Sequence, residues 1–196
     1  TQTISYLPHF VSWVVVGGLV YKLLDENTGA VNALIKACGG DAVAFMRSPG
    51  YFWAIIIITC IWKELGWNTI IFLAALSGID ADQYEAAVVD GANGWQRLIY
   101  ITIPGIMPTV GLMLIMTVGN LINANGSASF DAIYNLRNAM TAATSDTLDY
   151  YIFSQGIQHN EYSYAAAIGL VQGLVSLFLV TTANRISRKT QGYGAF

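Results

Sequence analysis

The chain is too apolar and too sparsely charged for a soluble globular domain. Of its 196 residues, 55% are hydrophobic and only 11% are charged, whereas soluble domains carry about 25% charged residues. The same composition excludes intrinsic disorder, a coiled coil and a disulfide-stapled secreted domain. A net charge of −3 without a basic patch excludes a typical nucleic-acid surface, and Cys38 and Cys60 lack metal-ligand spacing. The sequence therefore predicts a membrane protein.

Four long stretches with few charges predict the membrane spans. A span needs about 20 mostly apolar residues, and lipid leaves backbone N–H and C=O groups no partner outside a helix. We expect four helices, at about 4–24, 52–77, 105–124 and 163–184.

Basic residues beyond the last predicted span indicate its orientation. Cytoplasmic ends of spans are enriched in Lys and Arg, and three such residues follow residue 184: Arg185, Arg188 and Lys189. The C-terminus is therefore expected in the cytoplasm. Four crossings then place 78–104 inside, and 25–51 and 125–162 outside.

The second predicted span carries two adjacent charges, Lys63 and Glu64. Each costs about 2.5–3.5 kcal/mol at the centre of a membrane helix on insertion scales. Adjacent side chains point about 100° apart on a helix, so these two cannot simply pair with each other. They either line a translocation path or pair with other groups to hold the helices together. Asn68, one turn further, extends the polar stripe.

The segment 78–104 predicts a compact helix–turn–helix. Asp80 suits a helix N-cap, and Gly91 and Gly94 allow the chain to turn. Trp95 begins a second short amphipathic stretch, and Pro104 suits the first turn of the next span. Such a helical knob fits a groove on a partner. The alternative is an ordinary loop that lies on the membrane surface.

The last two predicted spans also carry polar and small residues. The third has polar side chains at every third position, Thr117, Asn120 and Asn123. They either bind solute hydroxyls or form hydrogen bonds between helices. In the last span, Gly169 and Gly173 form a close-packing face with Ala165, and Gln172 is a candidate for the translocation path.

One motif resembles a known family. The order Glu85-Ala86-Ala87, Gly91, Ile101 and Ile103-Pro104 resembles the EAA loop of binding-protein-dependent ABC importer permeases. The single departure is Ile103, where the family usually has Leu. The segments 4–10, 61–68 and 184–188 are similar to the carbohydrate-uptake branch, and within it to permeases that import complex oligosaccharides.

The resemblance implies an all-α polytopic membrane protein with a MetI-like ABC importer transmembrane domain. The whole chain, 1–196, would be one permease domain with about four of the usual six spans. The chain begins without Met or a signal peptide, which agrees with an N-terminal part lying before residue 1. The resemblance implies the bacterial inner membrane.

The resemblance also implies partners. A second permease subunit would complete the pore, two cytoplasmic ATPases would power it, and an external solute-binding protein would deliver a sugar or oligosaccharide. This chain lacks a phosphate-binding loop motif, so we expect no enzyme activity, cofactor or metal on it, with ATP held by the partner subunits. The residues expected to couple to the ATPases are Glu85, Ala86, Ala87, Asp90, Gly91, Ile101 and Pro104.

Other functions remain open from the residues alone. A membrane enzyme would need a catalytic motif, and no Gly-x-Ser-x-Gly or His-Glu-x-x-His pattern is present. A passive channel or facilitator would need no ATPase partner. A membrane scaffold would explain neither the EAA spacing nor the charges within the second span. An ABC importer for another class of solute is the nearest alternative.

Overall fold

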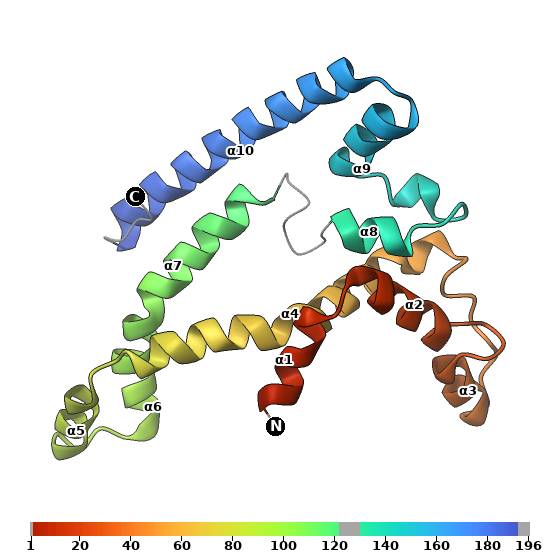
Figure 1. The fold of residues 1–196 in the computed structure, drawn as a ribbon. Coiled ribbons are helices and arrows are strands. Elements are labelled where there is room, and N and C mark those ends of the chain that lie inside the picture. Colours follow the sequence, from red (N-terminus) through yellow and green to blue (C-terminus); the bar gives the residue numbers. More distant parts are fainter. Residues whose placement is uncertain (1, 122–129, 192–196) are drawn as a thin grey trace. The chain divides into compact units, whose positions relative to one another are not determined.

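The computed structural model describes residues 2–121 and 130–191, which form helices and no strands. The all-helical fold class is thus confirmed for the described residues. Contacts divide the chain into two compact units, 1–66 with 122–172, and 67–121 with 173–196. Figure 1 labels the elements of both units.

The first unit has its core where α4 meets α8. Three residues of α4, Phe52, Ile56 and Cys60, pack there with Ala132, Ile133 and Leu136 of α8. The helices of this unit are α1 (Gln2–Phe10), α2 (Trp13–Leu23), α3 (Ala30–Ala37), the first part of α4 (Phe52–Ser77), α8 (Phe130–Leu136), α9 (Leu148–Phe153) and the first part of α10 (Tyr162–Gln191). Short 3-10 turns precede α4 and α9 (Pro49–Tyr51 and Ala142–Thr144), and a π turn follows α9 (Ser154–Gln158).

The predicted first span, 4–24, is divided into two helices. After α1 ends, the N–H of Val11 donates to the carbonyl of Pro8 in a tight turn. Ser12 then begins α2, because its hydroxyl accepts the N–H of Val15 at 3.5 Å. Within the described residues, three helices are long and apolar enough to span a membrane, Pro49–Ser77, Gly94–Gly119 and Tyr162–Lys189, and Trp13–Leu23 is a shorter apolar helix.

The second unit shows where the predicted third span, 105–124, differs from the structure. It contains the last part of α4, α5 (Ala81–Val89), α6 (Gly94–Arg97), a π turn (Leu98–Thr102), α7 (Ile103–Gly119) and the last part of α10. The helical run begins at Gly94 and ends at Gly119. Pro104 lacks an N–H and its ring crowds the preceding turn, so a widened π turn before α7 accommodates it without breaking the helix.

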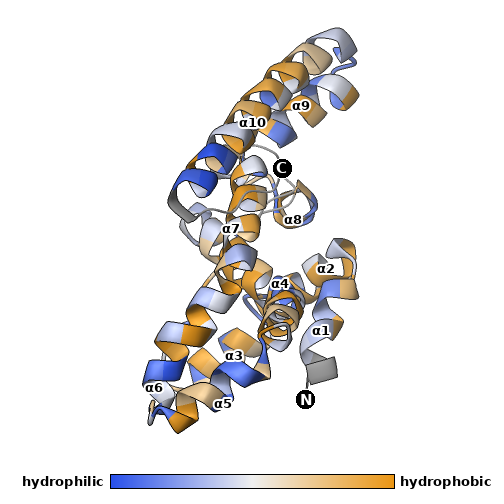
Figure 2. Cartoon of the chain, turned by 90° about the vertical axis from the view of Figure 1, so that its left-hand side faces the viewer, coloured by the Kyte–Doolittle hydropathy of each residue, from blue (hydrophilic) through white to orange (hydrophobic). Residues whose placement is uncertain are grey.

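Helix α10 buries polar side chains and exposes apolar ones. Gln172, Ser176, Asn184 and Ser187 are buried. Its exposed side chains include Leu170, Leu174, Leu177 and Phe178, and the apolar part of the helix is orange in Figure 2. This inverted pattern is expected for a helix whose outer surface faces lipid.

Candidate functional site

The predicted helix–turn–helix is present, and local hydrogen bonds define its turn. We call residues 80–97 the knob. Asp80 caps α5 by accepting the N–H of Asp82 at 3.0 Å. Gly91 has φ +76°, a conformation that other residues adopt only at a cost. Asn93 and Gln96 form a reciprocal capping box at the start of α6, with bonds of 2.8 and 2.9 Å.

The knob exposes apolar side chains. Helix α5 has no buried residue, and the exposed fraction of Val89 is 88%. Trp95 in α6 is 69% exposed, and Val88 is 56% exposed. Exposed apolar groups gathered on one short element are typical of a surface that another molecule covers.

The predicted coupling residues occupy different places around this knob. Glu85, Ala86 and Asp90 are exposed on α5 and at its end, and Ala87 is half-buried. Gly91 forms the turn. Ile101 is half-buried in the π turn, and Pro104 is exposed in the first turn of α7. The structure therefore places the Glu-Ala-Ala run on the knob and the Ile-Pro end of the motif at the start of a membrane helix.

The charges of the second predicted span have partners at the end of α1. Lys63 is buried, and its ammonium donates to the backbone carbonyl of His9. It also lies 5.5 Å from the centroid of the Trp13 ring, within cation–π range. Glu64 Oε2 lies 3.0 Å from His9 Nδ1. We call these four residues the Lys63 junction.

The Lys63 junction explains how a lysine is tolerated in an apolar helix. The last carbonyls of a helix lack intrahelical donors and carry partial negative charge. The break between α1 and α2 leaves such a carbonyl at His9, and Lys63 satisfies it. These contacts are the pairing expected from the structural interpretation of Lys63 and Glu64, and a role in the translocation path stays a prediction. Asn68 is half-buried and lies in the second unit.

Two of the polar positions predicted on the third span form hydrogen bonds with their own helix. Asn120 follows the end of α7, where its N–H donates to the carbonyl of Met116 at 3.1 Å. The hydroxyl of Thr117 donates to Met113 of its own helix. Asn123 lies outside the described residues.

Helix α10 supplies the remaining predicted positions. Gln172 donates to the carboxylate of Asp149 at 2.8 Å, which joins α10 to α9. Gly169 and Gly173 face open space, with no neighbouring atom within 4 Å of a Cβ placed on either. No helix of the described residues packs closely on these two glycines, and their packing against another helix stays a prediction.

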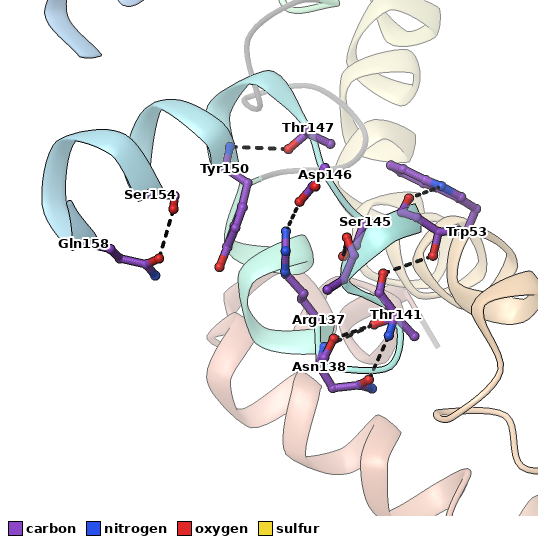
Figure 3. Close-up of polar contacts among 12 residues, drawn as sticks. Trp53, Arg137, Asn138, Thr141, Ser145, Asp146, Thr147, Tyr150, Ser154 and Gln158 are labelled. Carbon is purple, nitrogen blue, oxygen red and sulfur yellow. Dashed lines mark hydrogen bonds and ion pairs between the residues drawn. The ribbon is translucent and has the colours of Figure 1, made fainter. Parts of the chain in front are cut away.

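A polar cluster in the predicted external segment was missed by the sequence interpretation. Arg137 forms an ion pair with Asp146, and its guanidinium lies 3.8 Å from the centroid of the Tyr150 ring. The amide of Asn138 donates to the carbonyl of Met46 at 2.7 Å. Figure 3 shows these side chains between α8 and α9, with Trp53 of α4 donating to the carbonyl of Thr144. The two bonds to carbonyls join residues 92 and 91 positions apart, and the ion pair joins residues nine apart, so no local helical pattern predicts them.

The chain belongs to a family of membrane transport components. Residues 1–191 match the model of the family described as "Binding-protein-dependent transport system inner membrane component". This match covers the segment that contains the knob and all the helices described above.

Two bacterial relatives match nearly the whole chain. The chain is 37% identical over 195 residues to the protein LplB of Bacillus subtilis (strain 168), covering 100% of this chain and 60% of the relative. It is 36% identical to YteP of the same organism, a polygalacturonan/rhamnogalacturonan transport system permease, covering 96% of this chain and 57% of the relative. The chain thus spans about 60% of the length of these relatives.

Two solved structures share the fold. One is a bacterial ABC transporter involved in the import of the acidic polysaccharide alginate, with 40% identity and a TM-score of 0.90 over 96% of this chain and 65% of that chain. The other is the alginate transporter in complex with a periplasmic protein bound to an alginate pentasaccharide, with 39% identity and a TM-score of 0.91 over 99% of this chain and 66% of that chain.

Proposed function

We propose that this chain forms half of the translocation pore of an ATP-driven importer for a sugar or oligosaccharide. A solute-binding protein outside the cell delivers the solute, and a second permease subunit completes the pore. Two cytoplasmic ATPases power the importer, and this chain couples to the ATPases through the knob. The chain resides in the bacterial inner membrane, and the basic residues Arg185, Arg188 and Lys189 favour a cytoplasmic C-terminus.

The exposed knob carries this proposal. Its Glu-Ala-Ala run lies on a capped helix whose apolar side chains, Val88 and Val89 among them, are uncovered by the described chain. A passive channel would not require such a surface. The names of the relatives support a carbohydrate as the solute.

The proposal is tested by reversing the charge of the exposed Glu85 carboxylate. Glu85→Lys is expected to abolish solute uptake by cells and co-purification of the ATPases, while the permease still inserts in the membrane at normal levels. Glu161→Lys is the matched control, because Glu161 is also exposed but lies before α10. Normal uptake and normal co-purification by Glu85→Lys would refute the proposal.

Gly91 allows a second test that does not depend on charge. Its φ of +76° strains most side chains, although a Cβ there would meet no atom within 4 Å. Asn tolerates this conformation better than other residues. We therefore expect Gly91→Asn to retain uptake and Gly91→Trp to lose it at equal expression. Equal uptake by both variants would contradict a requirement for this turn.

A further inference from the structure

Two successive hydrogen bonds link the knob to the π turn that precedes α7. The hydroxyls of Tyr84 on α5 and Thr102 in the π turn lie 2.8 Å apart. Thr102 also donates to the carbonyl of Arg97, at 3.4 Å. A threonine hydroxyl has a single proton, so Thr102 uses it on Arg97 and accepts the proton of Tyr84. The order of donation is therefore Tyr84 to Thr102 to Arg97.

These two hydrogen bonds join α5, at the tip of the loop, to the start of α7. Tyr84 is one of only two half-buried residues on α5, and the others of that helix are exposed. Among the described residues, no other side-chain hydrogen bond joins α5 to the run from α6 to α7. Without it, α5 would be attached through the chain on either side and through apolar contacts.

An apolar contact lies beside the hydrogen bond. A Cβ placed on Gly105 of α7 would come within 2.7 Å of Ile79 Cδ1, so Ile79, just before α5, packs closely on the backbone of α7. The hydrogen bond and this contact lie on consecutive turns of one helical run, since Thr102 and Gly105 are three residues apart. Together they attach the beginning of α5 to the beginning of α7 at two points.

We infer that Tyr84 and Thr102 are positioning residues that make the knob and α7 move as one body. This inference deepens the proposed function and rests on it, because a movement of the ATPases would reach α5 first. With the hydroxyl pair intact, a displacement of α5 is carried directly to the first turn of α7. Without it, the displacement is partly absorbed by the turn at 90–93.

The test is a distance measured between the knob and α7 in the assembled importer. Spin labels replace Asp82 on α5 and Met116 on α7, which are both exposed. The distance distribution is recorded by pulsed electron paramagnetic resonance without nucleotide and with ATP plus vanadate. We expect one narrow distance that is the same in both states.

Three substitutions then probe the hydroxyl pair. Tyr84→Phe and Thr102→Val should each increase the population outside the native distance peak about three- to tenfold, the change expected for one net hydrogen bond. Their combination should be no worse than Thr102→Val alone, since Thr102→Val already removes the bond to Tyr84. Thr102→Ser keeps the hydroxyl and should retain the narrow distribution.

Tyr100→Phe is the matched control. It removes a tyrosine hydroxyl from the same loop, and Tyr100 is 76% exposed. The inference is overturned if Tyr84→Phe and Thr102→Val give the native distribution, or if the unmodified protein shows different distances in the two nucleotide states. Uptake by Glu85→Lys is a separate measurement that tests the proposed coupling to the ATPases. Normal uptake by Glu85→Lys would refute that coupling. A broadened distance distribution in Tyr84→Phe would still support the two-point attachment of α5 to α7.

Discussion

The Lys63 junction and the knob place polar and apolar groups in opposite environments. At the junction, a buried ammonium and a neighbouring carboxylate find partners in the same chain. On the knob, apolar side chains such as Val89 and Trp95 remain exposed. A buried charge must be satisfied before the chain is stable, whereas an exposed apolar surface gains from a partner. Substitutions at the Lys63 junction should therefore change the stability of the fold, and substitutions on the knob should change the binding of partner subunits.

The largest change in stability is expected from a substitution where α1 crosses α4. A Cβ on Gly66 would overlap the backbone carbonyl of Ser5, and a backbone atom cannot move aside as a flexible side chain can. Gly66→Ala should lower the unfolding free energy by about 3 kcal/mol, the upper range for overpacking, measured by denaturant unfolding in detergent micelles.

Gly169→Ala supplies the comparison for that experiment. Gly169 lies in a membrane helix with open space around a Cβ, so the same substitution should stabilise the protein by about 0.5–1 kcal/mol through helix propensity. Equal unfolding midpoints for the two variants would show that α1 does not approach α4 at Gly66.

The next effect concerns the ammonium at the Lys63 junction. Lys63→Met keeps an apolar stem but leaves the carbonyl of His9 without this donor. It should cost about 2 kcal/mol, within the range for a hydrogen bond to a charged group. Glu64→Gln keeps an acceptor near His9 and should cost less. If Lys63→Met unfolds like the unmodified protein but changes uptake, the side chain serves the translocation path.

A substitution on the knob should leave the stability of the chain nearly unchanged and weaken binding of the ATPases. Val89 is 88% exposed, so Val89→Ser should change the unfolding free energy of the chain by less than about 0.5 kcal/mol. It should weaken binding of the ATPases about tenfold if Val89 is an interface anchor, measured by titration of the purified subunits. Lower stability with unchanged binding would reverse the distinction between the two regions.

The smallest effect is expected on the pKa of Asp25, in the turn between α2 and α3. Backbone and side-chain hydrogen bonds from Thr28, followed by the N–H of Asn27, lower the pKa of Asp25 below its ordinary value. Because the native pKa is depressed, the turn is stabilised above the ordinary carboxyl pKa and loses that contribution as pH falls through the native value. Thr28→Val keeps the backbone donor and removes the hydroxyl.

The pKa of Asp25 in Thr28→Val should therefore rise partway toward its ordinary value. Carboxyl carbon chemical shifts followed during a pH titration measure it, and Thr28→Ser, which keeps a hydroxyl, is the control. An unchanged pKa in Thr28→Val would mean that the backbone donors alone set it.

Helix positions were predictable where charge and capping patterns are local. The predicted span 52–77 coincides with α4, because charged residues are rare there and Asp80 caps the next helix. The turn at Gly91 was predictable for the same reason. By contrast, Ser12 begins a new helix inside an apolar stretch. Hydropathy alone does not reveal this break, because a serine can lie either within a helix or at its start.

The partners of the buried polar groups could not be predicted. Lys63 meets a backbone carbonyl 54 residues away, and carbonyls are present at every position of a sequence. The pairing of Tyr84 with Thr102 likewise depends on the widened turn before α7. Local pattern thus identifies which groups need a partner, and tertiary packing decides which partner they find.

The π turn at Leu98–Thr102 sets the rotational phase between the knob and α7. Each residue of an α-helix turns the chain by about 100°, so the one additional residue of a π turn rotates everything beyond it by about that angle. The buried row of Gly111, Ile115 and Gly119 on α7 is therefore aligned with the knob only while the wide turn persists. If residues 98–102 closed into a regular α-helix without losing a residue, two well-formed helices would remain whose faces point in mismatched directions.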